Sequence, residues 1–346
     1  MKNIYDLSFF EIETIIKDIG EAPFRSKQIW EGLYQLCNSD WDDFSSLPKS
    51  LRERFGKDYS LTSLNKIESV FSDDLQTEKV LFQLSDSNYI ESVLLRKDDR
   101  LTLCISSQSG CPAGCIFCAT GNSGFNRNLT CGEIIEQVIF IINALKTKSE
   151  KLTNIVLMGM GEPFLNYENT IAAVERLNDA SGLNIGARRI TISTIGIIEK
   201  IKAFSNKELQ INLSVSLHAP NDKLRQLLIP VAKKYPIKEL IETCRLYIAK
   251  TNRRVTFEYV MIKGINDSPD FAKELIVLLR GLNCHLNLIP LNPNMHFSGS
   301  PSDASTIREF GRILIEKGVA ASIRDSQGSD IQAGCGQLAG KRVGVQ

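Results

Sequence analysis

From residue 101 onward, short apolar runs typical of β-strands alternate with longer stretches of helical periodicity. Regular alternation of this kind predicts a parallel sheet covered by helices. Eight strand–helix units close a complete barrel, so six units predict an incomplete (βα)6 barrel that is open on one side. The six strand-like runs are LTLCISS, NIVLMGM, RRITISTIG, INLSVSLH, RVTFEYVMI and HLNLIPL.

The rest of the chain has different patterns. Residues 1–62 alternate helical apolar patterns with short polar breaks, which predicts a small helical domain. Residues 63–98 hold three runs rich in Val, Ile, Leu and Phe, separated by turn-forming SDD and SDS, as expected of an antiparallel β-meander. We therefore place the α/β core at residues 99–326 and a C-terminal tail at residues 327–346.

Composition and charge exclude several classes of protein. Lysine plus arginine (41) nearly equal aspartate plus glutamate (40), so bulk charge does not indicate a polyanionic partner. Acids are scattered through the apolar N-terminal residues, unlike a signal peptide, and no stretch reaches membrane-spanning length. The nine cysteines, in a chain without an export signal, indicate reduced thiols. We expect a cytoplasmic protein with no membrane partner.

Three cysteines follow the first strand-like run at close spacing. Cys111, Cys115 and Cys118 lie in GCPAGCIFCATG, whose glycines and proline predict a loop. Three thiolates can hold three irons of a 4Fe-4S cluster and leave the fourth iron open, whereas a cluster held entirely by protein takes four cysteines. A structural zinc site is the plainer alternative. Such a site needs four ligands, usually as two separated pairs, and the surrounding sequence offers no second pair.

Polar residues follow or end several of the predicted strands. They are Glu162, Ser193, Ser216, His218 and Asn292. Because the carboxyl ends of barrel strands share one rim, we expect these side chains to converge on the loop that bears the three cysteines. A plainer interpretation is also open, since serine and asparagine often satisfy turns and a lone histidine is often a hydrogen-bonded structural residue.

Two further cysteines differ from the others. Cys104 lies on the first strand-like run, and Cys335 lies between two glycines near the C-terminus. The glycines permit close approach of another group, and a polar, flexible setting fits a reactive thiol. The remaining cysteines are interpreted as small buried hydrophobes, namely Cys37, Cys131, Cys244 and Cys284.

Several motifs together resemble the RlmN/Cfr family of radical S-adenosylmethionine RNA adenine methyltransferases. They are CISSQSGCPAGCIFCATG, LMGMGEPFLN, STIGII, SLHAPND, LIPLNP and DIQAGCGQLAG. The resemblance implies a 4Fe-4S cluster held by the Cys-x3-Cys-x2-Cys motif. It also implies S-adenosylmethionine contacts at Gly161, Glu162, Ser193, Ser216, Leu217, His218 and Asn292.

The resemblance further implies a two-stage reaction that uses two molecules of S-adenosylmethionine. Cys335 first accepts a methyl group, which a radical from the second molecule then activates for addition to adenine. Release requires Glu91 as proton acceptor and Cys104 as the resolving thiol, which forms a transient disulfide with Cys335. A thiol reductant and a flavodoxin-like electron-transfer protein are the implied partners. Strand alternation alone makes Glu91 a solvated surface carboxylate.

The implied substrates are 23S rRNA, at the peptidyl-transferase centre, and certain tRNAs, at the adenosine 3' of the anticodon. Within the family, GMGEP and a Pro-x-Asn-Pro element are typical of C2 methylation, and this chain has Glu162-Pro163 and Asn292-Pro293. Methylation at C8, as in the related resistance enzymes, is the alternative. Residues 1–62 resemble the family's RNA-binding extension, and we expect a monomer.

Two alternatives of other classes stay open. A radical S-adenosylmethionine maturase that modifies a polypeptide would not need Cys335, and a zinc-stabilised RNA-binding module would hold zinc instead of iron. Four basic pairs could contact phosphates, although such pairs are often solvated. They are Arg188-Arg189, Lys233-Lys234, Arg253-Arg254 and Lys341-Arg342.

Overall fold

The centre of the protein is a ten-stranded mixed sheet in the order β14-β13-β12-β11-β10-β9-β6-β5-β4-β3. The computed structural model describes residues 1–340, so the basic pair Lys341-Arg342 lies outside the described residues. Neighbouring strands from β6 to β14 run parallel. They are β6 (Arg100–Cys104), β9 (Asn154–Leu157), β10 (Ile190–Thr194), β11 (Asn212–Ser216), β12 (Val255–Met261), β13 (Cys284–Pro290) and β14 (Ala321–Ile323).

Six of these parallel strands coincide with the six predicted runs, so the expected α/β architecture is confirmed. The seventh, β14, was not predicted. It has three residues, two of them exposed, and therefore lacks the apolar pattern of its neighbours. β14 pairs only with β13 among the described residues, so the barrel stays open on that side.

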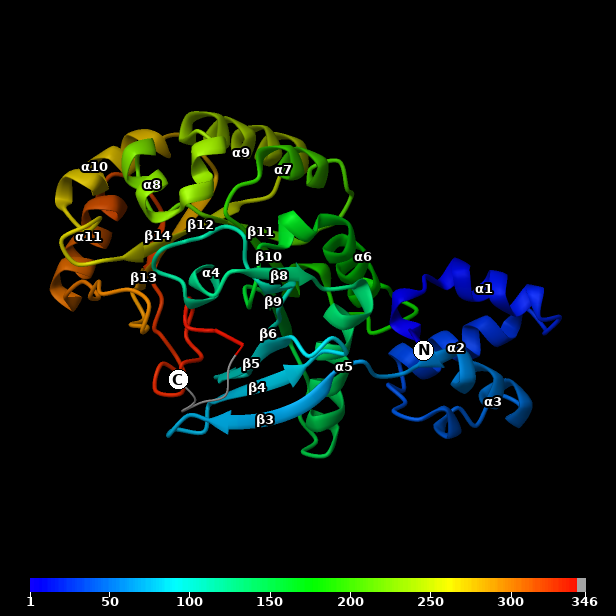
Figure 1. Cartoon of the computed structure of the whole chain (residues 1–346). Helices are drawn as coiled ribbons and strands as arrows, with labels where there is room; N and C mark the ends of the chain where they lie inside the picture. Colours follow the sequence, from blue (N-terminus) through cyan, green and yellow to red (C-terminus); the bar gives the residue numbers. More distant parts are fainter. Residues whose placement is uncertain (341–346) are drawn as a thin grey trace.

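Helices cover the outer side of the parallel strands (Figure 1). They are α5 (Cys131–Lys146), α6 (Tyr167–Asn178), α7 (Ile198–Phe204), α8 (Asp222–Leu228), α9 (Ile237–Thr251), α10 (Pro269–Leu278) and α11 (Ala304–Glu316). The start of α5 is fixed by a capping box, in which the Thr130 side chain accepts a hydrogen bond from the Glu133 backbone and the Glu133 side chain accepts one from Thr130. Each helix buries apolar side chains against the sheet, which forms one continuous core.

The predicted meander continues the same sheet. β3 (Asn65–Phe71), β4 (Thr77–Gln83) and β5 (Tyr89–Lys97) are antiparallel, and β5 pairs with β6 through Val93 and Cys104. Cross-strand partners in an antiparallel pair lie on the same face of the sheet. The register therefore places the meander directly beside the first strand of the barrel, with Cys104 at the junction.

The N-terminal residues form a helical unit beside α5 and α6 (Figure 1). Its elements are β1 (Lys2–Asn3), α1 (Phe9–Asp18), α2 (Phe24–Tyr34), α3 (Lys49–Asp58) and β2 (Tyr59–Ser60). Trp30 donates a hydrogen bond to Asp179 at 3.1 Å, and the Glu136 carboxylate accepts one from the Ser63 backbone at 2.7 Å. Among the described residues, no helix is both long enough and apolar enough to cross a membrane.

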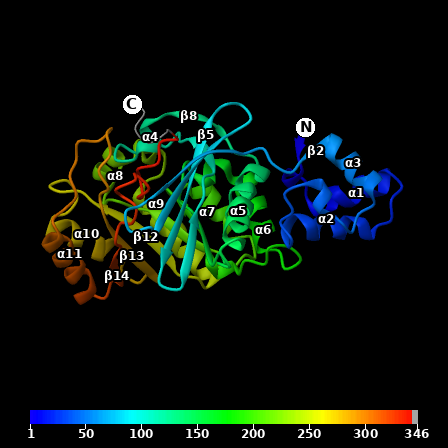
Figure 2. The same ribbon diagram turned by 90° about the horizontal axis from the view of Figure 1, so that it is seen from below.

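Two further segments lie outside the barrel strands and the meander. β7 (Gln108–Gly110) and β8 (Phe125–Asn128) form a small antiparallel pair, and the loop between them contains α4 (Ala119–Asn122). The C-terminal segment that follows β14 runs between α4 and the meander, as two perpendicular views show (Figures 1 and 2). Segments about 200 residues apart in the sequence are thus brought together, as the hydrogen bond from Thr120 to the Leu338 carbonyl illustrates.

The parallel strands carry the apolar core, and Leu286 of β13 is fully buried in it. We expect Leu286→Ala to lower the free energy of unfolding by about 2–5 kcal/mol, because the lost side chain leaves a cavity. Leu246→Ala on α9, where the side chain is 55% exposed, should change it by less than about 0.5 kcal/mol. Urea unfolding followed by circular dichroism measures both, and equal effects would contradict this placement of the core.

Candidate active site

The three clustered cysteines lie in a tightly folded loop between β7 and β8. Cys111 donates its backbone N–H to the Gly124 carbonyl at 2.8 Å, and a Cβ on Gly121 would lie 2.9 Å from the backbone N and O of Cys115. Gly110, at φ +74°, would place a Cβ 2.1 Å from the Gly124 oxygen. Glycine is therefore required where the loop packs against itself.

Cys111, Cys115 and Cys118 all line one pocket, which we call the triad pocket. Burial raises the pKa of the Cys111 thiol to about 12, and burial together with the neighbouring thiols raises the pKa of Cys115 well above its ordinary value. Thiolates in such a site need positive partners. No group of His, Cys, Asp and Glu in residues 1–340 converges on a single ion, but a cube-shaped cluster offers each thiol its own iron. The donor set therefore fits an iron–sulfur cluster.

Glu162 lines the triad pocket, as the strand-end prediction expected. Its carboxylate accepts hydrogen bonds from the backbone of Phe164 at 2.9 Å and Ile195 at 2.7 Å. Burial outweighs these bonds and raises its pKa to about 7. Gly161, at φ +103°, lets the chain pass Gln108, since a Cβ there would lie 2.6 Å from the Gln108 Cβ. The positive charge of a ligand ammonium beside Glu162 would favour the ionised form of this carboxylate.

Ser193, Ser216 and His218 also line the triad pocket, so these predicted residues are brought together. His218 Nδ1 accepts a hydrogen bond from the Val260 backbone at 3.0 Å, and burial lowers its pKa to about 3. The ring is therefore neutral, with its proton on Nε2. Leu217 differs, because its side chain is fully buried and does not line the pocket, which leaves only its backbone for a ligand.

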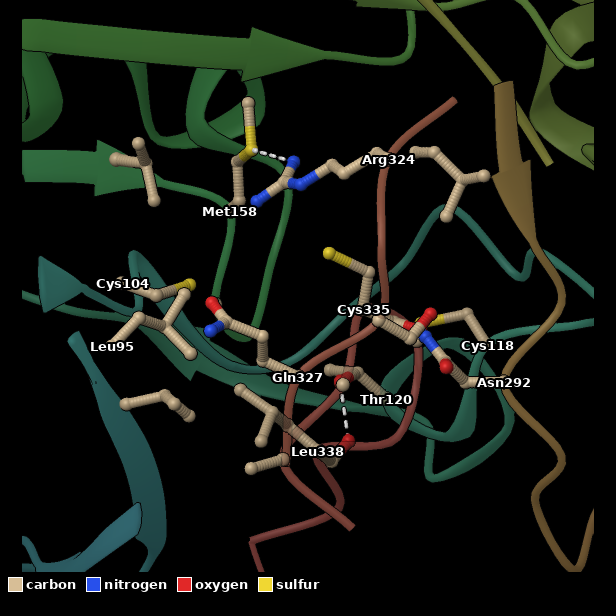
Figure 3. A pocket seen from close by; sticks show the side chains of 18 of the residues that line it. Leu95, Cys104, Cys118, Thr120, Met158, Asn292, Arg324, Gln327, Cys335 and Leu338 are labelled. Atoms are coloured by element: carbon tan, nitrogen blue, oxygen red, sulfur yellow. Dashed lines mark hydrogen bonds between the residues drawn. The ribbon is translucent and has the colours of Figure 1, made fainter. Parts of the chain in front are cut away.

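A second cavity adjoins the triad pocket and contains the other two predicted thiols (Figure 3). Cys104 and Cys335 face it from opposite sides, and Cys118 and Cys335 line both cavities. Cys335 is exposed, and neither Cys104 nor Cys335 is in a disulfide. Burial raises the pKa of Cys104 to about 12. We call this space the thiol cavity.

The other cysteines were predicted to be buried hydrophobes, which the structure confirms for Cys37, Cys131, Cys244 and Cys284. Asn292 lines the thiol cavity and not the triad pocket, and its amide donates a hydrogen bond to the Cys335 carbonyl at 3.0 Å. In this structure Asn292 therefore holds the tail, instead of facing the pocket that Glu162 and Ser193 line.

The interpretation of Glu91 as a solvated surface carboxylate is wrong. Glu91 is 1% exposed and forms an ion pair with Lys79 at 3.1 Å. Its other oxygen accepts hydrogen bonds from the backbone of Ala339 at 2.8 Å and Gly340 at 2.9 Å. Strand alternation identified the face of β5 but could not reveal that the C-terminal tail covers it. Glu91 does not line the thiol cavity in this arrangement.

Sequence reasoning missed three cations near the site. Lys79 is one, and no motif marks it. Arg225 is fully buried and donates to the carbonyls of Ile195 and Ser216, so it ties together the loops after β10 and β11. Arg324 follows β14 and lines both cavities, and the Cys335 thiol is the main cause of its raised pKa. Only the spatial arrangement reveals these roles.

The loop geometry predicts that Gly121→Ala disrupts cluster assembly, because the added Cβ would press on the Cys115 backbone. After anaerobic reconstitution we expect the wild type to hold about four irons with matching sulfide per chain, and the variant to hold much less. Gly186→Ala is the control, since nothing lies within 4 Å of a Cβ there. Equal iron and sulfide content in wild type and Gly121→Ala would contradict the assignment.

Comparisons with known proteins agree with this geometry. A model of the radical SAM superfamily matches residues 105–275, and a model described as the ribosomal RNA large subunit methyltransferase N-terminal domain matches residues 2–60. A radical SAM methyltransferase from Sphaerobacter thermophilus has a similar structure, with a TM-score of 0.96 and 46% identity. That match covers 99% of this chain and 100% of the other.

Curated relatives are similar over nearly their whole length. One is the probable dual-specificity RNA methyltransferase RlmN of Clostridium novyi, 42% identical over 98% of each chain. Another protein of that name, from Thermotoga maritima, is 45% identical over 99% of each chain. Identity at this level across both matched regions exceeds what a shared fold alone produces. The chain therefore belongs to the RlmN family of radical SAM RNA methyltransferases.

Proposed function

We propose that the protein methylates C2 of an adenine in RNA. Its substrates are 23S rRNA, at the peptidyl-transferase centre, and certain tRNAs, at the adenosine 3' of the anticodon. The GMGEP and Pro-x-Asn-Pro motifs and the names of the curated relatives support this assignment. The observation that carries it is the position of Cys335, which borders both the triad pocket and the thiol cavity with Cys104.

The triad pocket would hold the cofactors. Cys111, Cys115 and Cys118 would bind a 4Fe-4S cluster, and the neighbouring walls would bind S-adenosylmethionine. When bound, these groups supply the methyl group and the one-electron chemistry that the C–H bond of an adenine requires. Glu162 would pair with the ligand's ammonium, and the neutral His218 ring offers its Nε2–H as a donor.

Cys335 would carry the methyl group as a covalent intermediate. It is the exposed cysteine among the described residues, and it borders both cavities, into which the methyl donor and then the adenine would enter. Its Sγ forms a bond to the methyl carbon as the bond from that carbon to the donor sulfur breaks. The methyl-derived carbon is later joined to the adenine, so protein and RNA are covalently linked for part of the cycle.

Release would use two groups on the meander side. Glu91 accepts the proton from C2 of the adenine, and the electron pair of that C–H bond stays with the ring. The Cys104 thiolate attacks the Cys335 sulfur, so that a disulfide bond forms as the bond between that sulfur and the carbon breaks. The electron pair of the broken bond goes to the carbon, which takes up a proton and becomes the methyl group. Both thiols face the thiol cavity, which makes this exchange geometrically reasonable. A thiol reductant then restores both cysteines.

Other parts of the chain would handle RNA and electrons. The helical unit within residues 1–62 would contact the RNA by shape, and the target adenine must leave its stack to reach Cys335. A flavodoxin-like protein would supply the electrons. We place the reaction in the cytoplasm, where thiols stay reduced, and we assign a monomer as the working form.

The test is an anaerobic assay with reconstituted protein, S-adenosylmethionine, a reductant and a 23S rRNA fragment. Mass spectrometry of the digested RNA should find 2-methyladenosine and, in the tail peptide, methyl-Cys335. Cys335→Ala should abolish both products, because the exposed thiol that accepts the methyl group is lost. Cys284→Ala, which changes a buried cysteine outside both cavities, should keep both products.

Three outcomes would contradict the proposal. Formation of 8-methyladenosine would overturn the C2 assignment, and turnover by Cys335→Ala would favour an enzyme of the maturase type. Deoxyadenosine that accumulates without any methyladenine would overturn the choice of RNA as substrate.

The thiol cavity makes a further prediction for Cys104. Cys104→Ala should still form methyl-Cys335 and join it to RNA, but it should fail to resolve the link. Denaturing gels with labelled RNA should then show a covalent protein–RNA adduct, with 2-methyladenosine reduced below detection. Cys131→Ala is the control, since Cys131 is buried at the start of α5. Product formation by Cys104→Ala at the wild-type rate would exclude Cys104 as the resolving thiol.

A further inference from the structure

One face of the meander is covered by the C-terminal tail. Glu91, Val93 and Leu95 alternate along β5 and therefore point to the same side. Lys79 pairs with Val93 across the strands, and Val93 pairs with Cys104, so Lys79 and Cys104 share that side. Val93, Leu95 and Cys104 line the thiol cavity, whereas Glu91 and Lys79 do not.

Tail residues separate Glu91 from the thiol cavity. Glu91 lies two residues from Val93, roughly 7 Å along the strand. Leu338 lines the cavity, and the next two residues, Ala339 and Gly340, donate their backbone N–H groups to the Glu91 carboxylate. Withdrawal of these residues would extend the cavity along the same face of β5 until it reached Glu91.

Both oxygens of the Glu91 carboxylate are engaged by protein groups in this arrangement. One oxygen faces the Lys79 ammonium at 3.1 Å and the other accepts the two tail N–H groups. A general base must come within hydrogen-bond reach of the proton it removes, and the buried Glu91 carboxylate is covered by the tail residues that donate to it. Glu91 therefore works as an anchor of the tail here.

Lys79 contacts both the Glu91 carboxylate and the C-terminal tail. Its side chain is 6% exposed, and its Nζ donates a hydrogen bond to the Gln332 carbonyl of the tail at 3.3 Å, besides pairing with Glu91. Lys79 and Glu91 lie on adjacent strands of one rigid sheet, whereas Gln332 belongs to the tail. The ion pair can thus persist when the tail moves, although the hydrogen bonds to the tail cannot.

We propose that Lys79 is a positioning residue for Glu91 and that Ala339 and Gly340 must leave the carboxylate before it can accept a proton from the RNA adenine. The inference rests on the proposed function. The ion pair with Lys79 holds the Glu91 carboxylate in place on the meander face, and withdrawal of the tail N–H groups frees one oxygen. When the proton is then transferred, the C2–H bond breaks, the proton moves to Glu91 and the electron pair stays with the adenine ring.

The positioning role is tested with Lys79→Met and Lys79→Gln in the reconstituted full-length protein. Both variants should form methyl-Cys335 and join it to RNA as the wild type does. Removal of the adenine proton should then slow by about 10²-fold, the low end of what a general base contributes. The protein–RNA adduct should therefore accumulate on denaturing gels. Lys79→Arg should restore most of the release, and Lys66→Met, at an exposed position on β3, should behave as wild type.

The outcomes distinguish a positioning role of Lys79 from a purely structural role. Release at the wild-type rate in both variants would overturn the inference, and so would loss of methyl-Cys335 in both variants, which would indicate a purely structural role. If the wild type itself forms no methyl-Cys335, the proposed function fails and not the role of Lys79 alone.

The tail movement has a separate measurement, hydrogen exchange of the Ala339 and Gly340 amides. Both amides should exchange slowly in the resting holoprotein and faster in Glu91→Ala, because the acceptor is lost. They should also exchange faster in the adduct trapped by Cys104→Ala. Unchanged exchange in Glu91→Ala, or equal protection in the resting protein and the trapped adduct, would overturn the proposed withdrawal.

Discussion

The site depends on the burial of three thiols in one short loop. Thiolates are costly in an apolar setting unless positive charge lies beside them, and the raised pKa values of Cys111 and Cys115 reflect this cost. A metal cluster removes the cost because each thiolate bonds to an iron. The glycines that let the loop pack against itself hold the three sulfurs at one pocket, so the loop is shaped for a ligand that the chain alone does not contain.

The C-terminal tail completes the site from a distant part of the sequence. It returns from β14 to the cysteine loop, where the Ala119 backbone donates to the Gly336 carbonyl at 2.7 Å, and then to the meander at Glu91. This course places Cys335 between the two cavities. Most of the hydrogen bonds that hold the tail join a side chain to the backbone, as those of Thr120, Asn292 and Glu91 do.

The sequence predicted the parts of the protein that local pattern determines. Alternating apolar runs located six parallel strands and the meander, and the cysteine spacing located the loop that becomes the triad pocket. β14 was missed because it has three residues, two of them exposed, and so carries no periodic signal. Contacts made across long sequence separations were also missed. The burial of Glu91 depends on residues 339 and 340, and the bond from Asn292 depends on Cys335.

The most direct test of the central claim is electron paramagnetic resonance of the anaerobically reconstituted and reduced protein, before and after addition of S-adenosylmethionine. If the three thiols hold a 4Fe-4S cluster with one open iron, the reduced protein should give a cluster signal that changes when the ligand binds that iron. A protein that retains the cluster but gives the same spectrum with and without S-adenosylmethionine would contradict the account.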